Sequence, residues 1–305
     1  MAETDPVVIV GAARTPMGAF QGALKDLSTP ELGSVAIKAA LERASLAPDQ
    51  VSEVFMGCVL PAGLGQAPAR QASLAAGLPQ SIGCTTVNKV CGSGMKAAML
   101  GHDLIRAGSA EIVPVSVKGR GGETLVASDE QALKADPAKI PTLKPAFRPD
   151  GTVTAANSSS ISDGAAALVL MRRSEAERRG LAPLAEIRAH AAHAQAPAWF
   201  TTAPVEAIRR LLDRVGWRAD EVDLYEINEA FAVVTMAAMR DLGLPHEKVN
   251  PNGGACALGH PIGASGARLI VTLLAALQRR GLKRGIASLC IGGGEATAMA
   301  IERLN

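Results

Sequence analysis

Cys91 is the first residue in the chain whose setting suggests chemistry. It stands in the segment Asn88-Lys-Val-Cys-Gly-Ser-Gly, between a predicted strand and the start of a predicted helix. A thiol at a helix N-terminus lies near the positive end of the helix dipole and near free backbone N–H groups, which lower its pKa and favour the thiolate. The glycines on either side of Ser93 let another backbone or a ligand approach closely. This setting is typical of a nucleophile, and the alternative is a small buried cysteine at a tight turn.

His260 lies in a second glycine-rich segment, 253–266, just before a long predicted helix. Its place in the second half of the chain is similar to that of Cys91 in the first half. If a pseudo-twofold axis relates the halves, the two side chains face each other across it. A histidine there could serve as a general base, although a lone histidine is more often a polar surface or core residue.

Cys290 ends a predicted strand and is followed by a triple glycine that begins at Gly292. The backbone N–H groups of such a turn could form an oxyanion hole beside the thiol. A buried strand cysteine is the ordinary alternative. Asn228 opens a predicted helix, where an asparagine is also simply a good N-cap.

The remaining cysteines and a pair of histidines are interpreted as structural. The five cysteines form no CxxC pair and are odd in number, which argues against a disulfide framework or a zinc ribbon. We assign Cys58, Cys84 and Cys256 to packing. His190 and His193 are three residues apart on a predicted strand with no third ligand in view, so no metal site is predicted.

The elements that must position these residues occur in two rounds of the same order. The first round has predicted strands at 7–11, 51–57, 84–88, 110–113 and 163–171, and predicted helices at 29–44, 66–76 and 92–107. The second has predicted strands at 184–194, 221–227, 248–250, 286–291 and 296–303, and predicted helices at 203–215, 229–242 and 263–280. Such alternation indicates parallel βαβ units, and its repetition indicates two related halves of one α/β fold.

One junction breaks this regularity. The strand predicted at 110–113 runs directly into Pro114, which cannot donate to a sheet ladder. The stretch 118–155 is then polar, rich in proline and glycine, and only weakly periodic. An irregular link of that length in a compact domain is either functional or a sign that a segment is missing.

Composition excludes several classes of partner. The 305 residues carry a net charge of +2 and only 3% aromatic side chains, so the chain offers neither a basic stripe nor stacking platforms for nucleic acid. No apolar run approaches the ~18 residues of a membrane span. The acidic start, Met-Ala-Glu-Thr-Asp, is unlike a signal peptide. We therefore expect a cytoplasmic protein with no membrane partner.

Taken together, four motifs resemble the thiolase family, and within it the acetyl-CoA acetyltransferases. They are Asn-Lys-Val-Cys91-Gly-Ser-Gly-Met-Lys-Ala, Asn228-Glu-Ala-Phe-Ala, Gly-His260-Pro-Ile-Gly-Ala-Ser-Gly and Leu-Cys290-Ile-Gly-Gly-Gly. Their order and spacing make the likeness specific, and it covers nearly the whole chain. The resemblance implies the duplicated, five-layered α/β/α/β/α sandwich of that family.

The resemblance also implies a role for each motif residue. Cys91 would take the acyl group as a thioester. His260 would activate Cys91 and, with a water held by Asn228, stabilise the thioester carbonyl oxygen. Cys290 would remove a proton from the α-carbon of the second acetyl-CoA, and the backbone N–H groups of Cys91 and Gly292 would form the second oxyanion hole.

Three further residues match family positions that contact the substrate. Ser159 matches a pantetheine-contacting serine, and Phe147 and Phe231 match residues lining the coenzyme A channel. The implied reaction joins two acetyl-CoA molecules into acetoacetyl-CoA and CoA, or reverses that step by thiolysis. Acyl-CoA is then the substrate, and no cofactor or metal is implied.

The chain departs from the family in the region that covers the active site. Family members carry a large, mostly helical loop domain after the strand matched here by 110–113, and most of it is missing. We therefore expect a first part of the N-terminal half at 1–113, a loop-domain remnant at 114–151, a closing strand of that half at 152–172 and a C-terminal half at 173–305. The family forms dimers through strands near the nucleophile, so we expect a homodimer, whereas the tetramer contacts lie in the absent insert.

Two alternatives stay open beside an active thiolase. The first is a thiolase-fold remnant that keeps the catalytic residues but lacks the covering lid, and so binds coenzyme A poorly. The second is a ketoacyl-synthase-like condensing enzyme, which also uses Cys, His and Asn. Cys290 and the Asn228-Glu-Ala-Phe-Ala phrase argue against the second.

Overall fold

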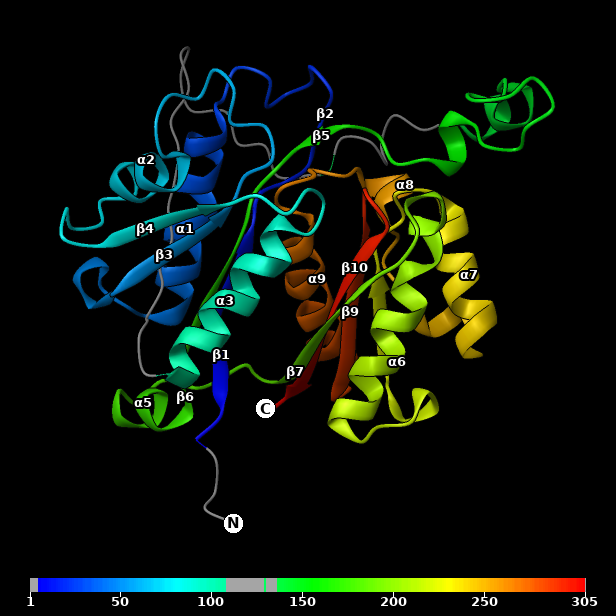
Figure 1. Ribbon diagram of the computed structural model, residues 1–305. Helices are drawn as coiled ribbons and strands as arrows, with labels where there is room; N and C mark the ends of the chain where they lie inside the picture. The colour runs from blue at the N-terminus through cyan, green and yellow to red at the C-terminus, as the bar shows by residue number, and fades with distance from the viewer. Residues whose placement is uncertain (1–4, 108–128, 130–135, 305) are drawn as a thin grey trace.

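The computed structural model describes residues 5–107, 129 and 136–304. Figure 1 shows five layers, in which helices cover the outer face of the strands of each half and two further helices lie between the two layers of strands. The first outer layer is α1 (Thr29–Ala44) and α2 (Pro68–Ala75), the central layer is α3 (Ser93–Ala107) and α9 (Ser265–Arg280), and the last is α6 (Ala203–Val215) and α7 (Ala232–Leu242). The predicted α/β/α/β/α architecture is confirmed.

The second half of the chain forms a continuous sheet in the order β7-β10-β9-β8. Its strands are β7 (Ala185–Ala194), β8 (Leu224–Ile227), β9 (Arg284–Ile291) and β10 (Glu295–Arg303). β10 is antiparallel to β7 and β9, while β8 is parallel to β9. β9 is buried on both faces because helices cover the sheet from both sides, which explains its almost continuous apolar sequence.

The first half is divided into two separate strand pairs. β1 (Val7–Arg14) is antiparallel to β6 (Ala166–Arg172), and β3 (Glu53–Gly57) is parallel to β4 (Gly83–Val87). β1 also joins β7 through two residue pairs, so that β6 and β1 extend the sheet of the second half. The strand predicted at 110–113 lies outside the described residues.

The space between β3 and β6 holds a cavity of about 240 Å³. Its lining includes Val54 and Met56 from β3, Leu168 from β6, Leu32 from α1 and Ala97 from α3. The strand order shows which position in the sheet this space corresponds to. Across the second half, the order is Val249, β8, β9, β10 and β7. Across the first half, the order is β4, β3, the cavity, β6 and β1. The cavity thus occupies the place that β9 fills in the second half.

Local sequence sets the helix limits. Ser28 caps α1, with Glu31 completing a capping box, and α6, α7 and α9 each end at a left-handed glycine. The strand predicted at 248–250 is reduced to a single bridge between Tyr225 and Val249. The short elements are β2 (Gly18–Ala19), β5 (Ser162–Asp163), α5 (Arg173–Arg178) and α8 (Ala255–Leu258). None of the described helices has the length and apolar character needed to span a membrane.

Candidate active site

The turn that carries Cys91 joins β4 to α3 and is fixed by Ser93. The backbone N–H of Lys89 donates to the Ser93 hydroxyl at 2.9 Å, and that hydroxyl donates to the Val90 carbonyl at 2.6 Å. Val90 takes a left-handed backbone with φ of 45°, which is strained for a β-branched residue. The turn therefore holds Cys91 just before the N-terminus of α3, in a backbone conformation that this sequence does not favour locally.

Burial raises the pKa of the Cys91 thiol, although the backbone N–H groups of Gly292 and of Cys91 itself act to lower it. The sequence predicts the opposite, a thiolate favoured by the helix N-terminus. That prediction is wrong because desolvation disfavours the charged form more than the N–H groups favour it. Cys91 at rest is a thiol and needs a base, and the same two N–H groups lie close to its sulfur.

Cys290 lies at the end of β9 and is buried. Its pKa is raised to about 12, first by burial and then by the neighbouring Cys91. The two sulfurs are therefore close enough to disfavour each other's charge. The predicted pair of thiols, one from each half of the chain, is brought together.

The glycine turn after Cys290 faces the Cys91 turn. Gly293 and Gly294 have φ of 98° and 93°, and a Cβ on Gly294 would lie 2.2 Å from the Gln195 carbonyl oxygen. An ion pair between Lys89 and Glu295 links the two turns. This link holds the Gly292 N–H beside Cys91.

His260 is buried and its ring orientation is set by Ser265. The Ser265 hydroxyl donates to the Pro261 carbonyl at 3.1 Å, so at 2.6 Å it accepts from Nδ1 of His260. Nε2 then carries the lone pair, and it has no hydrogen-bond partner among the described residues. Burial and the nearby Arg268 guanidinium lower the pKa of His260 to about 4. The ring is a neutral base at physiological pH.

Glycines let the loops of Cys91 and His260 meet where α3 crosses α9. A Cβ on Gly266 would lie 2.3 Å from the Met95 nitrogen, and a Cβ on Gly94 would lie 3.0 Å from both the Gly263 oxygen and the Ala267 nitrogen. Only glycine permits this backbone approach. The Gly-rich phrases on either side of the crossing therefore bring together helix N-termini that lie far apart in sequence.

Asn228 is fully buried between the helix crossing and β8. Its backbone N–H donates to the Ser288 carbonyl at 2.9 Å, and its Oδ1 accepts from Arg268 at 3.4 Å. Its Nδ2 has no partner within the described part of the chain. Arg268 also pairs with Glu226 at 3.5 Å, both side chains being buried. Asn228 is held by its oxygen and leaves its amide N–H groups available.

A strand-like segment connects the predicted substrate-contacting residues to His260. The N–H and hydroxyl of Ser159 both donate to the Ala230 carbonyl at 3.1 Å, and three residues on, Ser162 Oγ accepts from the His260 N–H at 3.2 Å. The Phe147 and Phe231 rings are in edge contact with centroids 6.0 Å apart. Phe147 itself is 72% exposed, so this aromatic pair faces solvent.

Several residues of this site escape sequence reasoning. Phe200 extends the aromatic pair, with its centroid 6.3 Å from that of Phe231. Ser265, Glu226 and Arg268 act on His260 and Asn228 through contacts that local sequence does not show. Among these residues, only Arg268 stands out in the sequence, because it is a charged residue within the apolar stretch of α9.

Comparison with known proteins gives a consistent result. The C-terminal domain of thiolase matches residues 181–303, and the N-terminal domain of thiolase matches 7–113 and 109–174. Acetyl-CoA acetyltransferase 2 of Arabidopsis thaliana is 42% identical, covering 98% of this chain and 97% of its own, and an acetyl-CoA acetyltransferase of Cupriavidus necator is also 42% identical, covering 97% and 99%.

Solved structures with a similar fold point to the same family. The Acat5 thiolase of Ascaris suum, in complex with coenzyme A, superposes with a TM-score of 0.90 at 35% identity, covering 98% of this chain and 100% of that chain. The acetyl-CoA acetyltransferase of Syntrophomonas wolfei gives a TM-score of 0.93 at 29% identity, covering 99% and 100%.

The alignment with the Arabidopsis relative also locates a difference in length. It runs over 391 positions, which exceeds the 305 residues of this chain by 86. The N-terminal domain matches in two pieces that overlap at 109–113. Positions present in the relatives are therefore absent from this chain, and the interruption falls where the regular alternation of strands and helices breaks.

Proposed function

This chain belongs to the thiolase family, and we propose that it is an acetyl-CoA C-acetyltransferase, condensing two acetyl-CoA molecules into acetoacetyl-CoA and CoA or catalysing the reverse thiolysis. The observation that carries the proposal is the pair of neighbouring thiols, half-buried Cys91 and buried Cys290, with the Gly292 N–H beside Cys91. Relatives at 42% identity that are acetyl-CoA acetyltransferases support the acetyl group as the unit transferred.

The first step is transfer of the acetyl group to Cys91. The Nε2 lone pair of His260 takes the thiol proton, and the sulfur attacks the thioester carbonyl of acetyl-CoA. Protonated Nε2 and a water held by Asn228 stabilise the resulting oxyanion. The carbon–sulfur bond to CoA then breaks, leaving acetyl-Cys91.

Cys290 acts first as an acid and then as a base. Because its pKa is raised to about 12, it is a thiol at rest and gives its proton to the departing CoA sulfur. Acetyl-Cys91 can no longer ionise, so no charge on Cys91 opposes a Cys290 thiolate. That thiolate then takes a proton from the α-carbon of the second acetyl-CoA.

The carbanion attacks the acetyl carbonyl on Cys91. A carbon–carbon bond forms, and the backbone N–H groups of Cys91 and Gly292 stabilise the tetrahedral oxyanion. The carbon–sulfur bond to Cys91 then breaks, and the sulfur recovers its proton from His260. Acetoacetyl-CoA leaves, with Cys290 again a thiol.

Incubation with acetyl-CoA tests the proposal directly. We expect one acetyl group on the peptide that contains Cys91, found by mass spectrometry, with release of CoA. Cys91→Ser should carry no acetyl thioester, whereas Cys84→Ser, which alters a half-buried cysteine outside the site, should acetylate normally. A folded wild-type protein with unmodified Cys91 would contradict the proposal.

A second candidate function is a thiolase-fold protein with impaired binding of coenzyme A. The alignment positions that this chain lacks favour it, because they show that the relatives carry residues that are absent here. A calorimetric titration with CoA separates the two candidates. Tight, saturable binding excludes the impaired protein, while absent binding together with unmodified Cys91 supports it.

We also propose that the chain forms a homodimer through β4. Within the described residues, β4 pairs only with β3, and Gly83 and Thr85 are exposed. A free strand edge close to Cys91 is suited to pairing with the same edge of a second copy.

A further inference from the structure

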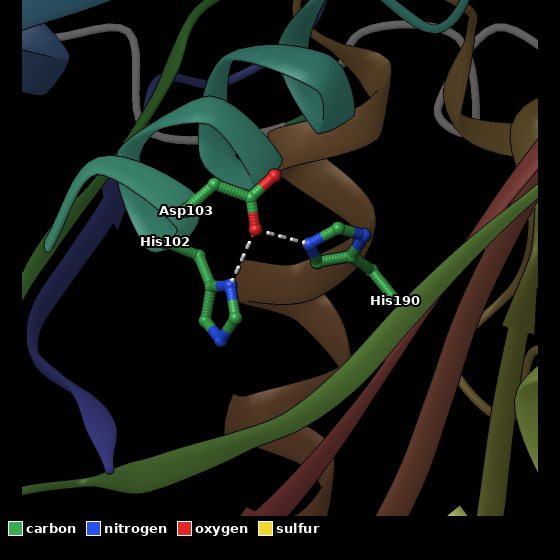
Figure 2. A group of neighbouring side chains, drawn as sticks. All are labelled: His102, Asp103 and His190. Atoms are coloured by element: carbon green, nitrogen blue, oxygen red, sulfur yellow. Dashed lines mark hydrogen bonds and ion pairs between the residues drawn. The ribbon is translucent and has the colours of Figure 1, made fainter. Parts of the chain in front are cut away.

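A cluster of two histidines and an aspartate joins the two halves of the molecule. His102 and Asp103 come from the later turns of α3, and His190 comes from β7 (Figure 2). We propose that His102, Asp103 and His190 bind a divalent transition-metal ion. The sequence gives His190 no third ligand because both partners lie nearly ninety residues away in the chain.

The three donor atoms already converge. Asp103 Oδ1 lies 3.1 Å from Nδ1 of His102 and 2.9 Å from Nε2 of His190, and all three donor atoms lie within 4.8 Å of one another. Ligands at ordinary zinc–nitrogen and zinc–oxygen distances in a tetrahedral site are about 3.3 Å apart. An ion can therefore replace the two hydrogen bonds with small movements of the side chains.

The surrounding structure holds the ligands in place. The His102 side chain is only 6% exposed and its ring lies edge-on to that of His190, with centroids 5.1 Å apart. The backbone carbonyl of His190 accepts from Arg214 at 2.8 Å. Asp103, in contrast, has a side chain that is 51% exposed, which leaves access for an ion and for water as a further ligand.

The donor set determines which ions fit. Two imidazole nitrogens and one carboxylate oxygen suit zinc, cobalt, nickel, copper or ferrous iron, whereas calcium and magnesium prefer oxygen ligands alone. A bound ion would tie α3 of the first half to β7 of the second. Because the three ligands converge only in the folded chain, binding should raise the unfolding temperature.

Cobalt(II) added to the metal-free full-length chain is the direct probe. We expect one ion per chain, visible absorption typical of a four- or five-coordinate site, and displacement by zinc but not by magnesium. Asp103→Asn should weaken binding at least tenfold, and His190→Gln should do the same. His246→Gln, which alters an exposed histidine on another surface, is the matched control and should bind as the wild type does.

Each outcome decides the proposal. Absence of binding to the wild type at millimolar cobalt overturns it, as does unchanged affinity in Asp103→Asn. Thiolate-to-cobalt charge-transfer absorption in the near ultraviolet would place the ion on a cysteine instead and also overturn it. Circular dichroism confirms that the variants fold, and Asp103 is exposed enough for its amide variant to do so. None of these measurements depends on acetyl transfer.

Discussion

The two halves of this molecule differ in the strand at the centre of their sheets. In the second half, β9 lies between β8 and β10 and is buried on both faces. In the described part of the first half, a cavity lies at the equivalent place between β3 and β6. Among the described residues, the strand order is thus continuous in the second half and interrupted in the first.

This difference shows which contacts hold each thiol. Cys290 ends β9, so the complete sheet positions it. Cys91 follows β4 and is held instead by the Ser93 hydrogen bonds, the Gly266 crossing and the ion pair between Lys89 and Glu295. Within the described residues, the nucleophile is therefore anchored by its own turn and by contacts with the second half.

The largest expected effect distinguishes the two thiols by role. Cys91→Ala should abolish acetyl-enzyme and lower condensation by at least about 10³-fold, because the nucleophile is lost. Cys290→Ala should still accumulate acetyl-Cys91, more slowly, while condensation falls roughly 10²- to 10⁴-fold. Mass spectrometry and an acetoacetyl-CoA assay measure the two steps. Equal loss of acetylation in both variants would show that the thiols are not divided in this way.

A smaller effect compares packing in the two halves. Leu289→Ala on β9 should cost about 3–5 kcal/mol of unfolding free energy, since the side chain is fully buried in a complete layer. Leu168→Ala on β6 should cost only about 1–2 kcal/mol, because that side chain already borders the cavity and loses fewer contacts. Urea unfolding of the two variants checks this. Equal costs would mean that the space beside β6 is filled.

The smallest expected effect concerns how the unfolding free energy at acid pH depends on His260. The pKa of His260 is about 4 in the folded protein, below its ordinary 6.5, so as pH falls the unfolded state binds this proton first. The contribution of the neutral His260 ring to the unfolding free energy is fully present above about pH 6.5 and is lost as the pH falls towards 4. Between pH 7.5 and 5 the unfolding free energy should fall by about 2 kcal/mol for this reason. His260→Gln should lack this component.

Comparing urea unfolding of wild type and His260→Gln at both pH values isolates the histidine. Glu226 has a pKa raised to about 7 by burial, so its contribution has the opposite sign, and it is common to both proteins. An identical pH dependence in the two proteins would show that His260 is not buried as a neutral base.

Sequence alone predicts the layers and the motif residues because both depend on local patterns. Alternating periodicity marks the strands and helices, and glycines beside Cys91, His260 and Cys290 mark the loops that must approach one another. The pKa of Cys91 is predicted in the wrong direction, because burial comes from distant elements. For the same reason, the contact of Asp103 with His190, 87 residues apart, is visible only after folding.

The antiparallel pairing of β1 with β6 has a consequence for chain entropy. Arg14 pairs with Ala166, so the ladder closes a loop of roughly 150 residues, and the break in the match to the thiolase N-terminal domain falls inside it. Loop-closure entropy grows only with the logarithm of length, so a relative with about 86 further residues in this loop would face a closure cost only about 0.4 kcal/mol higher. A shorter connection therefore makes it only slightly easier to bring β1 and β6 together. Its larger consequence is that fewer residues are available to pack against the folded chain.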